Sequence, residues 1–553
     1  MEIKSLLKLI IVSVLTVTFS SCFKGEHADL IIHNANIISV DGNGTIYEAM
    51  VIRDGKILEL GKERQILNKY SADEVIDANL ATILPGFIDG HCHFLGYGLS
   101  QQQVQLKGAL SMMDVIDKCQ NYNAQNNPAW ITGRGWDNTI WEDENFPNNE
   151  LLNKAFPDKP VLIRRIGGHA ALANDVALKL AQFTDSTIIP GGHIEVLAGK
   201  LTGIVMDNAV DKILELIPAP TKADKTNAIL QAQRDCFALG LTTVDDAGLN
   251  KEDVQLLQEM EANESLKMKI YVMLSDNPEN FSYFIDSAKG PFRSKLLNVN
   301  AFKFYGDGAL GARSACLIKP YADVKDTLNY GFLLQNPSYF KEKAQKVYDA
   351  GFQMCTHCIG DSAARIILDS YGSVLGGSND KRWRIEHAQV LHPDDFSKFR
   401  EFSILPSVQP THATSDMGWA TKRLGKNRVQ YSYAYYSLLA ENGFIILGTD
   451  FPIENINPIE TFYAAVARKD KSGLPADGFM KNEALTRTEA LRGMTIWAAL
   501  GNFEENQKGS LEIGKDADFI FLSQDLMEVP EDMILNTSVT ATYVNGICVF
   551  QEN

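Results

Sequence analysis

Eight short apolar segments recur between residues 81 and 452, and helical patterns separate most of them. The segments are ATILPGFIDGHCHF, LTTVDDAG, KIYVML, NAFKFYGDG, FQMCTHCIG, RWRIEHAQV, FSILPSVQP and FIILGTDFP. Between them, stretches such as 221–240 and 337–351 begin with Thr or Pro and end with Gly, as helices do. Strands that alternate with helices form a parallel sheet, and eight such units close into a barrel. The sequence therefore predicts an α/β fold, a (β/α)8 TIM barrel, over residues 85–505.

The two ends of the chain have a different pattern, in which apolar and polar residues alternate between turn residues. The N-terminal part contains DLIIHNANIISV and EAMVIRDGKILELG, and the C-terminal part contains DADFIFLS and VTATYVNGICVFQ. Such alternation is typical of antiparallel strands, and Asn545-Gly546 is a hairpin signal. We expect one small β-sandwich domain built from both chain ends, residues 23–84 and 506–553.

The first two predicted barrel strands are separated by far more residues than one crossover needs. The gap, from His93 to Thr242, contains strand candidates of its own, AWITGRGW and PVLIRRIGG. We interpret residues of about 98–220 as a large insertion after barrel strand 1. Because loops at this end of a barrel carry function, we expect the insertion to form a lid or to shape the substrate site.

The N-terminus has the pattern of an export signal. Two lysines precede an apolar stretch, and small residues and Cys22 follow, in FSSC. This predicts a lipoprotein signal peptide over residues 1–22, with the mature protein lipid-anchored through Cys22 in a bacterial cell envelope, periplasmic or outer-membrane. An ordinary signal peptide cut nearby, or an uncleaved anchor, are the alternatives. The formal charge of −17 argues against a nucleic-acid partner, and the sequence does not decide between a monomer and a homodimer.

Polar residues that bind metals stand at the ends of the predicted barrel strands. His91 and His93 are two positions apart, so on a strand both point to the same side. The other four lie in or at the end of later predicted strands, and the six together are His91, His93, Lys303, His357, His387 and Asp450. In a TIM barrel the C-terminal strand ends meet at one face, so these side chains converge. The pattern predicts a metal site.

Motifs over nearly the whole mature chain are similar to those of one known group of proteins. They include LPGFIDGHCHF, GWDNTIWEDENFP, PVLIRRIGGHAALAND, AFKFYGDGALGARSA, THCIGDSA, RIEHAQ, PSVQPTHATSD, LGTDFPIE and GSLEIGKDADFIFLS. With these motifs the chain resembles the amidohydrolase superfamily, in its family-3 branch of YtcJ-like and N-substituted formamide deformylase-like proteins.

The resemblance implies roles for the six strand-end residues. His91, His93 and Asp450 would bind one divalent metal ion, and His357 with His387 would bind a second. The metal that the resemblance implies is zinc. Lys303 would bridge the two ions after carboxylation by CO2; the alternative is a structural lysine paired with Asp307. Asp450 would also act as the catalytic base, and the alternative for it is a helix cap.

Four further residues are candidates for substrate binding. The resemblance suggests a substrate contact for His169 in the insertion. His412 and Asp416, after strand seven, would bind substrate or support the site. Trp136 would line the pocket, or alternatively pack in the core of the insertion.

These expectations describe a hydrolase that cleaves a non-peptide C–N bond in a small molecule with metal-activated water. The bond would belong to an amide, a formamide or an N-acyl compound. Other enzyme readings are a cyclic amide or imide hydrolase, a ring deaminase and a small-peptide hydrolase. A reading of another class is a catalytically inactive surface binding lipoprotein, but the complete ligand set favours the enzyme.

Overall fold

The computed structural model describes residues 25–143, 145–165, 170–189, 191–287, 289–324 and 328–552. Cys22 and His169 therefore lie outside the described residues. The chain divides into two compact units, the first formed by Met1–His93 with Gln233–Asn553 and the second by Phe94–Ala232. Within the described ranges, no helix has the length and apolar character needed to cross a membrane.

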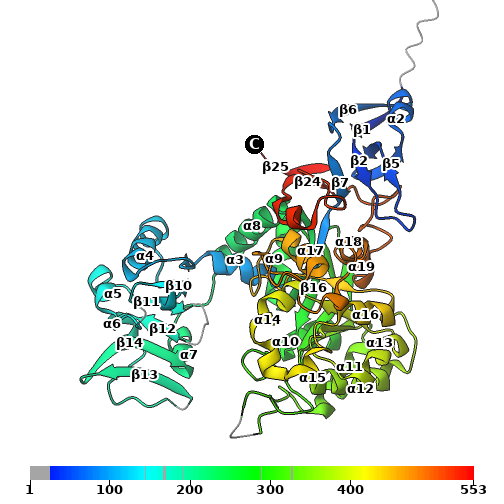
Figure 1. Cartoon of the computed structure of the whole chain (residues 1–553). Helices are drawn as coiled ribbons and strands as arrows, with labels where there is room; N and C mark the ends of the chain where they lie inside the picture. Colours follow the sequence, from blue (N-terminus) through cyan, green and yellow to red (C-terminus); the bar gives the residue numbers. More distant parts are fainter. Residues whose placement is uncertain are drawn as a thin grey trace, which may run out of the picture. The chain divides into compact units, whose positions relative to one another are not determined.

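The first unit contains the predicted TIM barrel (Figure 1). Its eight parallel strands follow one another in chain order: β8 (Phe87–Cys92), β15 (Leu241–Leu249), β16 (Lys269–Ser275), β18 (Leu297–Tyr305), β19 (Gln353–Cys358), β20 (Arg384–His387), β21 (Leu405–Val408) and β22 (Ile446–Leu447). Every one overlaps a predicted apolar segment. A Cβ atom on Gly90 would lie 2.2 Å from Cγ2 of Ile446, so glycine lets the first strand approach the last. The barrel fold is confirmed.

Helices connect most of the barrel strands. Their bounds are α8 (Lys222–Ala238), α9 (Lys251–Ala262), α11 (Pro337–Asp349), α12 (Asp361–Leu375), α13 (Phe396–Glu401), α14 (Pro410–Leu424), α16 (Tyr435–Asn442) and α17 (Pro458–Ala467). Their ends follow the expected chemistry: Asn336 caps α11 through its side chain, ahead of a proline at the first helical position, and Gly376 ends α12 with a positive φ. Helix α14 starts directly after β21, which places it at the catalytic face.

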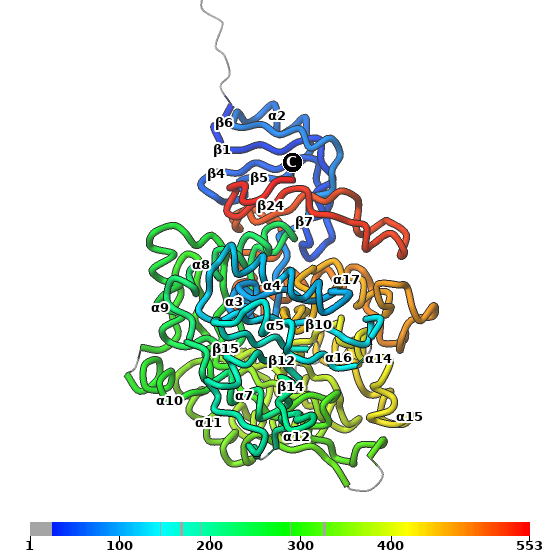
Figure 2. The backbone as a smooth tube through the Cα atoms, turned by 90° about the vertical axis from the view of Figure 1, so that its left-hand side faces the viewer, coloured from blue at the N-terminus to red at the C-terminus, as the bar shows by residue number. Residues whose placement is uncertain are grey.

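Both chain ends build the small β domain of the first unit. One sheet has the order β5 (Lys56–Gly61), β4 (Ala49–Arg53), β1 (Glu26–His33), β6 (Tyr70–Asp77), and the other β25 (Ile547–Gln551), β24 (Val539–Val544), β23 (Phe519–Leu522), β7 (Thr82–Pro85), β2 (Asn36–Ile38), β3 (Ile46–Tyr47). In Figure 2 the N-terminal strands, in blue, adjoin the C-terminal strands, in red. Leu30 and Ile52 from one sheet share a core with Ile83 and Phe519 from the other, as in a sandwich.

The second unit has a sheet of its own. The order is β13 (Gly192–Leu197), β14 (Lys200–Asp207), β12 (Ala170–Ala173), β11 (Val161–Arg165), β10 (Ile131–Trp136), β9 (Val104–Gln105). Helices α4 (Met112–Asn126), α5 (Glu150–Ala155), α6 (Asp175–Leu180) and α7 (Asn208–Leu214) belong to the same unit. Both predicted strand segments of the insertion, AWITGRGW and PVLIRRIGG, contribute to this sheet as β10 and β11.

Candidate metal centre

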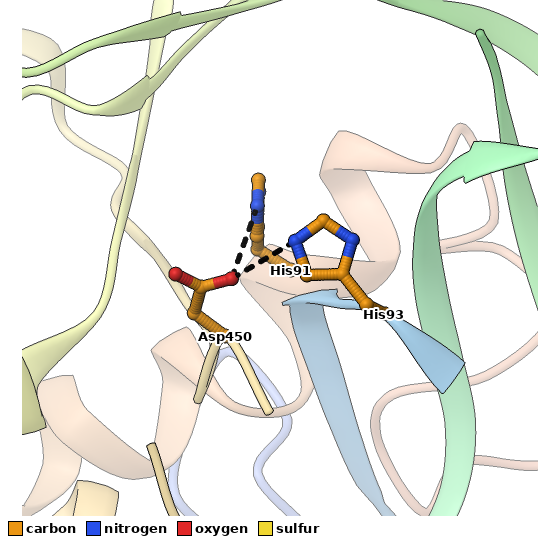
Figure 3. Close-up of side chains that lie close together, drawn as sticks. All are labelled: His91, His93 and Asp450. Carbon is orange, nitrogen blue, oxygen red and sulfur yellow. Dashed lines mark ion pairs between the residues drawn. The ribbon is translucent and has the colours of Figure 1, made fainter. Parts of the chain in front are cut away.

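The barrel strands bring the six predicted strand-end residues to one place. Figure 3 shows three of them, His91, His93 and Asp450, with their side chains turned toward one another. Asp450 follows the last barrel strand and has a φ of 61°, and His387 ends β20 with a φ of 72°. Left-handed backbone is uncommon for residues other than glycine and clusters at functional sites. The chain therefore holds two of the candidate ligands in costly local conformations.

Asp450 lies between the two histidines of the first strand. Its Oδ1 is 3.2 Å from Nε2 of His93 and 3.8 Å from Nε2 of His91. One ligand atom from each of the three residues lies within 4.8 Å of the others, a spacing that suits a shared ion. Burial raises the pKa of Asp450, but the neighbouring imidazoles of His412 and His93 outweigh burial and hold this pKa well below its usual range. The carboxylate is therefore ionised at neutral pH.

The other ring nitrogens of both histidines are already engaged. Nδ1 of His91 is 2.6 Å from Oε2 of Glu386, and Nδ1 of His93 is 2.9 Å from the carbonyl oxygen of Ala247. Metal-binding histidines are usually held in this way, so that the Nε2 lone pair faces the ion. The two imidazoles thus have the orientation of metal ligands.

Glu386 was missed in the sequence analysis. It is fully buried, immediately before His387 in RIEH, and burial that would raise its pKa is outweighed by His91, which lowers it to about 2. A carboxylate inside an apolar strand, next to a candidate ligand, is the signal that would have identified it.

His357 and His387 form the second half of the cluster. Their ring centroids are 4.4 Å apart, and the centroid of His387 is 5.0 Å from that of His91. Burial lowers the pKa of both, that of His357 to about 3 with a further contribution from Lys303. Both rings are therefore neutral at physiological pH, which is the form that binds a metal.

Lys303 lies within the same cluster. Its Nζ is 3.0 Å from Nε2 of His91, and burial lowers its pKa. The bonds of Asp307, its alternative partner, go to backbone N–H groups of Cys316, Ile359 and Gly360. Asp307 thus ties the loop after β18 to the end of β19.

Three of the four substrate-binding candidates are described. His412 joins the cluster: its Nε2 is 3.2 Å from Oδ2 of Asp450, and its Nδ1 is 3.1 Å from Oε1 of Glu454. Asp416, one turn further along α14, lines the same cavity. Trp136 is fully buried in the core of the second unit, where its Nε1 donates to the carbonyl oxygen of Ile163. This matches the alternative that Trp136 packs in the core of the insertion.

The polar atoms of this cluster fit a divalent ion. Nε2 of His357, Nδ1 of His387 and Oδ1 of Asp450 are buried and make no hydrogen bond within the described residues. Unpaired buried polar atoms are costly, and an ion would pair all three. Neutral imidazoles with a carboxylate are ligands that zinc and related ions prefer. The cluster opens into a cavity of about 390 Å3, a size suited to a small molecule.

Comparison with known proteins agrees with a metal-dependent hydrolase. The model of the amidohydrolase family Amidohydro_3 matches residues 74–550. The chain is 34% identical to the protein LONG AFTER FAR-RED 3 of Arabidopsis thaliana, over 94% of this chain and 91% of that one. It is 26% identical to the N-substituted formamide deformylase of Arthrobacter pascens, over 95% and 98% respectively.

A solved structure supports both fold and family. An uncharacterized metal-dependent hydrolase from Pyrococcus horikoshii OT3 has a TM-score of 0.78 at 28% identity, covering 91% of this chain and 99% of that one. The resemblance found in the motifs is thereby confirmed. The chain belongs to the amidohydrolase family, a family of metal-dependent hydrolases.

Proposed function

We propose that this protein hydrolyses a non-peptide C–N bond of a small amide, formamide or N-acyl compound, with zinc as its metal. The observation that carries the proposal is the cluster of histidines around the ionised Asp450. The name of the Arthrobacter pascens relative, a deformylase of N-substituted formamides, favours an amide substrate over a deaminated ring.

Different side chains of the site have different roles in the proposed hydrolysis. His91, His93 and Asp450 would hold one ion, and His357 with His387 a second. When bound, such ions supply Lewis acidity toward the substrate carbonyl and make water more acidic. Asp450 takes a proton from the attacking water and later delivers it to the amine that leaves. His412 holds Oδ2 of Asp450, so that Oδ1 stays directed at the two histidines.

Lys303 is suited to carry a carbamate. Only a neutral amine adds to CO2, and burial lowers the pKa of Lys303 and so favours that form. An ammonium group cannot bind a cation. Carboxylation would convert it to a carbamate, an anion with two donor oxygens. It would lie next to His91, whose Nε2 is 3.0 Å from Nζ.

The test is the metal content of the mature chain from residue 23 onward, purified without chelator and supplied with zinc and bicarbonate. About two zinc ions per chain support the bridged site; about one ion would leave Lys303 a structural role. No bound metal would overturn the proposal and leave the inactive binding lipoprotein as the better reading.

Activity is then measured with formamides, cyclic imides and dipeptides. Asp450→Asn should abolish turnover of whichever substrate is cleaved while leaving the fold intact by circular dichroism. Wild-type rates in that variant would refute Asp450 as the base.

A further inference from the structure

The cavity continues beyond the imidazole cluster along helix α14. Asp416 and Trp419, three positions apart on that helix and hence neighbours on its surface, both line it. Leu310 and Ile453 contribute apolar wall. This outer part combines a carboxylate, a large aromatic ring and apolar surface, and the proposed chemistry of the metal centre uses none of these groups.

Asp416 has only neutral hydrogen-bond partners. Its Oδ2 accepts from the hydroxyl of Tyr433 at 2.8 Å and from Nε2 of Gln389 at 3.2 Å. Nothing in the described part of the chain bonds to Oδ1. Burial raises the pKa of Asp416 to about 6 although the nearby positive charge of His412 opposes this shift, so the group is ionised at pH 8. Among the described residues, Asp416 therefore places a negative charge beside the cavity with no cation bonded to it, because the positive His412 nearby is bonded to Asp450 and Glu454.

The positive groups near the cavity are engaged elsewhere. His412 uses one ring nitrogen for Asp450 and the other for Glu454. Lys303 is the only lysine or arginine among the described residues that line the cavity, and it lies inside the imidazole cluster.

The guanidinium of Arg423, which does not line the cavity, lies over the Trp419 ring, 5.7 Å from its centroid, and is bonded to Asp323. Among the described residues that line the cavity, no basic side chain is thus left to receive a substrate carboxylate.

We propose that the outer cavity selects substrates with a positively charged group, such as a primary ammonium, remote from the bond that is cleaved. Asp416 would pair with this charge, and the face of Trp419 would attract it through its π electrons. Substrates with a carboxylate at that place, including N-acyl amino acids and small peptides, would meet Asp416 as a like charge with little water between them. The inference rests on the proposed function and names its substrate class.

Three formamides of one size test the selectivity: N-formyl-benzylamines that carry aminomethyl, methyl or carboxylate at the para position. With the zinc-loaded mature chain at pH 8, kcat/KM should fall in that order, by roughly tenfold or more from the first to the last. Asp416→Asn should reduce the ratio between the cationic and anionic substrates by roughly tenfold. Asp73→Asn, which removes an equally negative but exposed carboxylate in the β domain, should leave the ratio unchanged.

Equal turnover of the cationic and anionic formamides, or a ratio that Asp416→Asn does not alter, would overturn the inference while the proposed function stands. If none of the three formamides is hydrolysed, the amide proposal fails. The inference about a cationic substrate group is then tested by ligand binding alone. Benzyltrimethylammonium, a cation that cannot ligate a metal, is then titrated calorimetrically. Weaker binding to Asp416→Asn than to wild type and to Asp73→Asn supports the inference, and equal or absent binding refutes it.

Discussion

Oε2 of Glu386 lies 2.6 Å from Nδ1 of His91, and both side chains are completely buried. The two residues are 295 positions apart in the chain, on the sixth and the first strand of the barrel. The pair connects strand β20 to the His-x-His motif, and it directs Nε2 of His91 toward Lys303 and Asp450. Glu386 is therefore a positioning residue for the metal centre.

Glu386→Gln should weaken zinc binding by about 10- to 100-fold, because a metal ligand loses the carboxylate that orients it and raises its basicity. Zinc affinity is measured by competition with a chromogenic chelator. The control is Glu342→Gln, at an exposed glutamate on α11, which should bind zinc like the wild type. Unchanged affinity in the Glu386 variant would mean that the pair only stabilises the fold.

The barrel was predictable because its signals are local. Each strand is a short apolar run, and the six candidate ligands, from His91 to Asp450, are visible in five of these runs. Glu386 and Asp89 were missed because their partners are remote in the sequence. Asp89 accepts from the backbone N–H and the hydroxyl of Thr449, 360 positions away, and so holds the residue before Asp450.

The insertion was less predictable. Its strand segments were identifiable, but which strands pair, and whether Trp136 faces a cavity or a core, depend on contacts between segments that no local pattern encodes. The second unit begins at Phe94 and ends at Ala232, beyond both ends of the predicted insertion of about 98–220, because it includes helix α3 (Phe94–Gln101) and the first part of α8.

Lipid anchoring at Cys22 has its own test, because this residue precedes the described part of the chain. When the full-length chain is expressed in a bacterium with labelled palmitate, the wild type should incorporate label and sediment with membranes. Cys22→Ala should lose both, whereas Cys548→Ala, at an exposed cysteine near the C-terminus, should keep both. Label in the Cys22 variant would refute the lipoprotein assignment, and an unlabelled wild type would leave an ordinary signal peptide.

Arg384 lies inside the barrel and pairs with Asp245, their Nη1 and Oδ2 atoms 2.8 Å apart and both side chains fully buried. Arg384→Met should lower the free energy of unfolding by about 3–5 kcal/mol, because it leaves the Asp245 carboxylate buried without its partner. The double variant Arg384→Met/Asp245→Leu should lose less, since no unpaired charge remains. Urea unfolding of the full mature chain measures both, with the exposed Arg400→Met as control. A double variant less stable than the single one would contradict this account.

Variants of Trp136 distinguish a role in packing from a role in substrate contact. It is enclosed in the core of the second unit, with its ring 5.9 Å from that of Trp141 and its Nε1 bonded to Ile163. Trp136→Ala should therefore cost about 3–5 kcal/mol of stability. Trp136→Phe, which keeps most of the ring but removes the hydrogen bond to the Ile163 carbonyl, should cost about 1–3 kcal/mol.

Urea unfolding of the mature chain measures the stability of both Trp136 variants, and the exposed Met113→Ala on α4 serves as the control. Because the side chain is fully buried in the core of the second unit, KM for any substrate found should stay within about threefold in Trp136→Phe at a temperature where the variant is folded. A large rise in KM with unchanged stability would instead place Trp136 at the substrate, and would mean that the second unit rearranges around it when substrate binds.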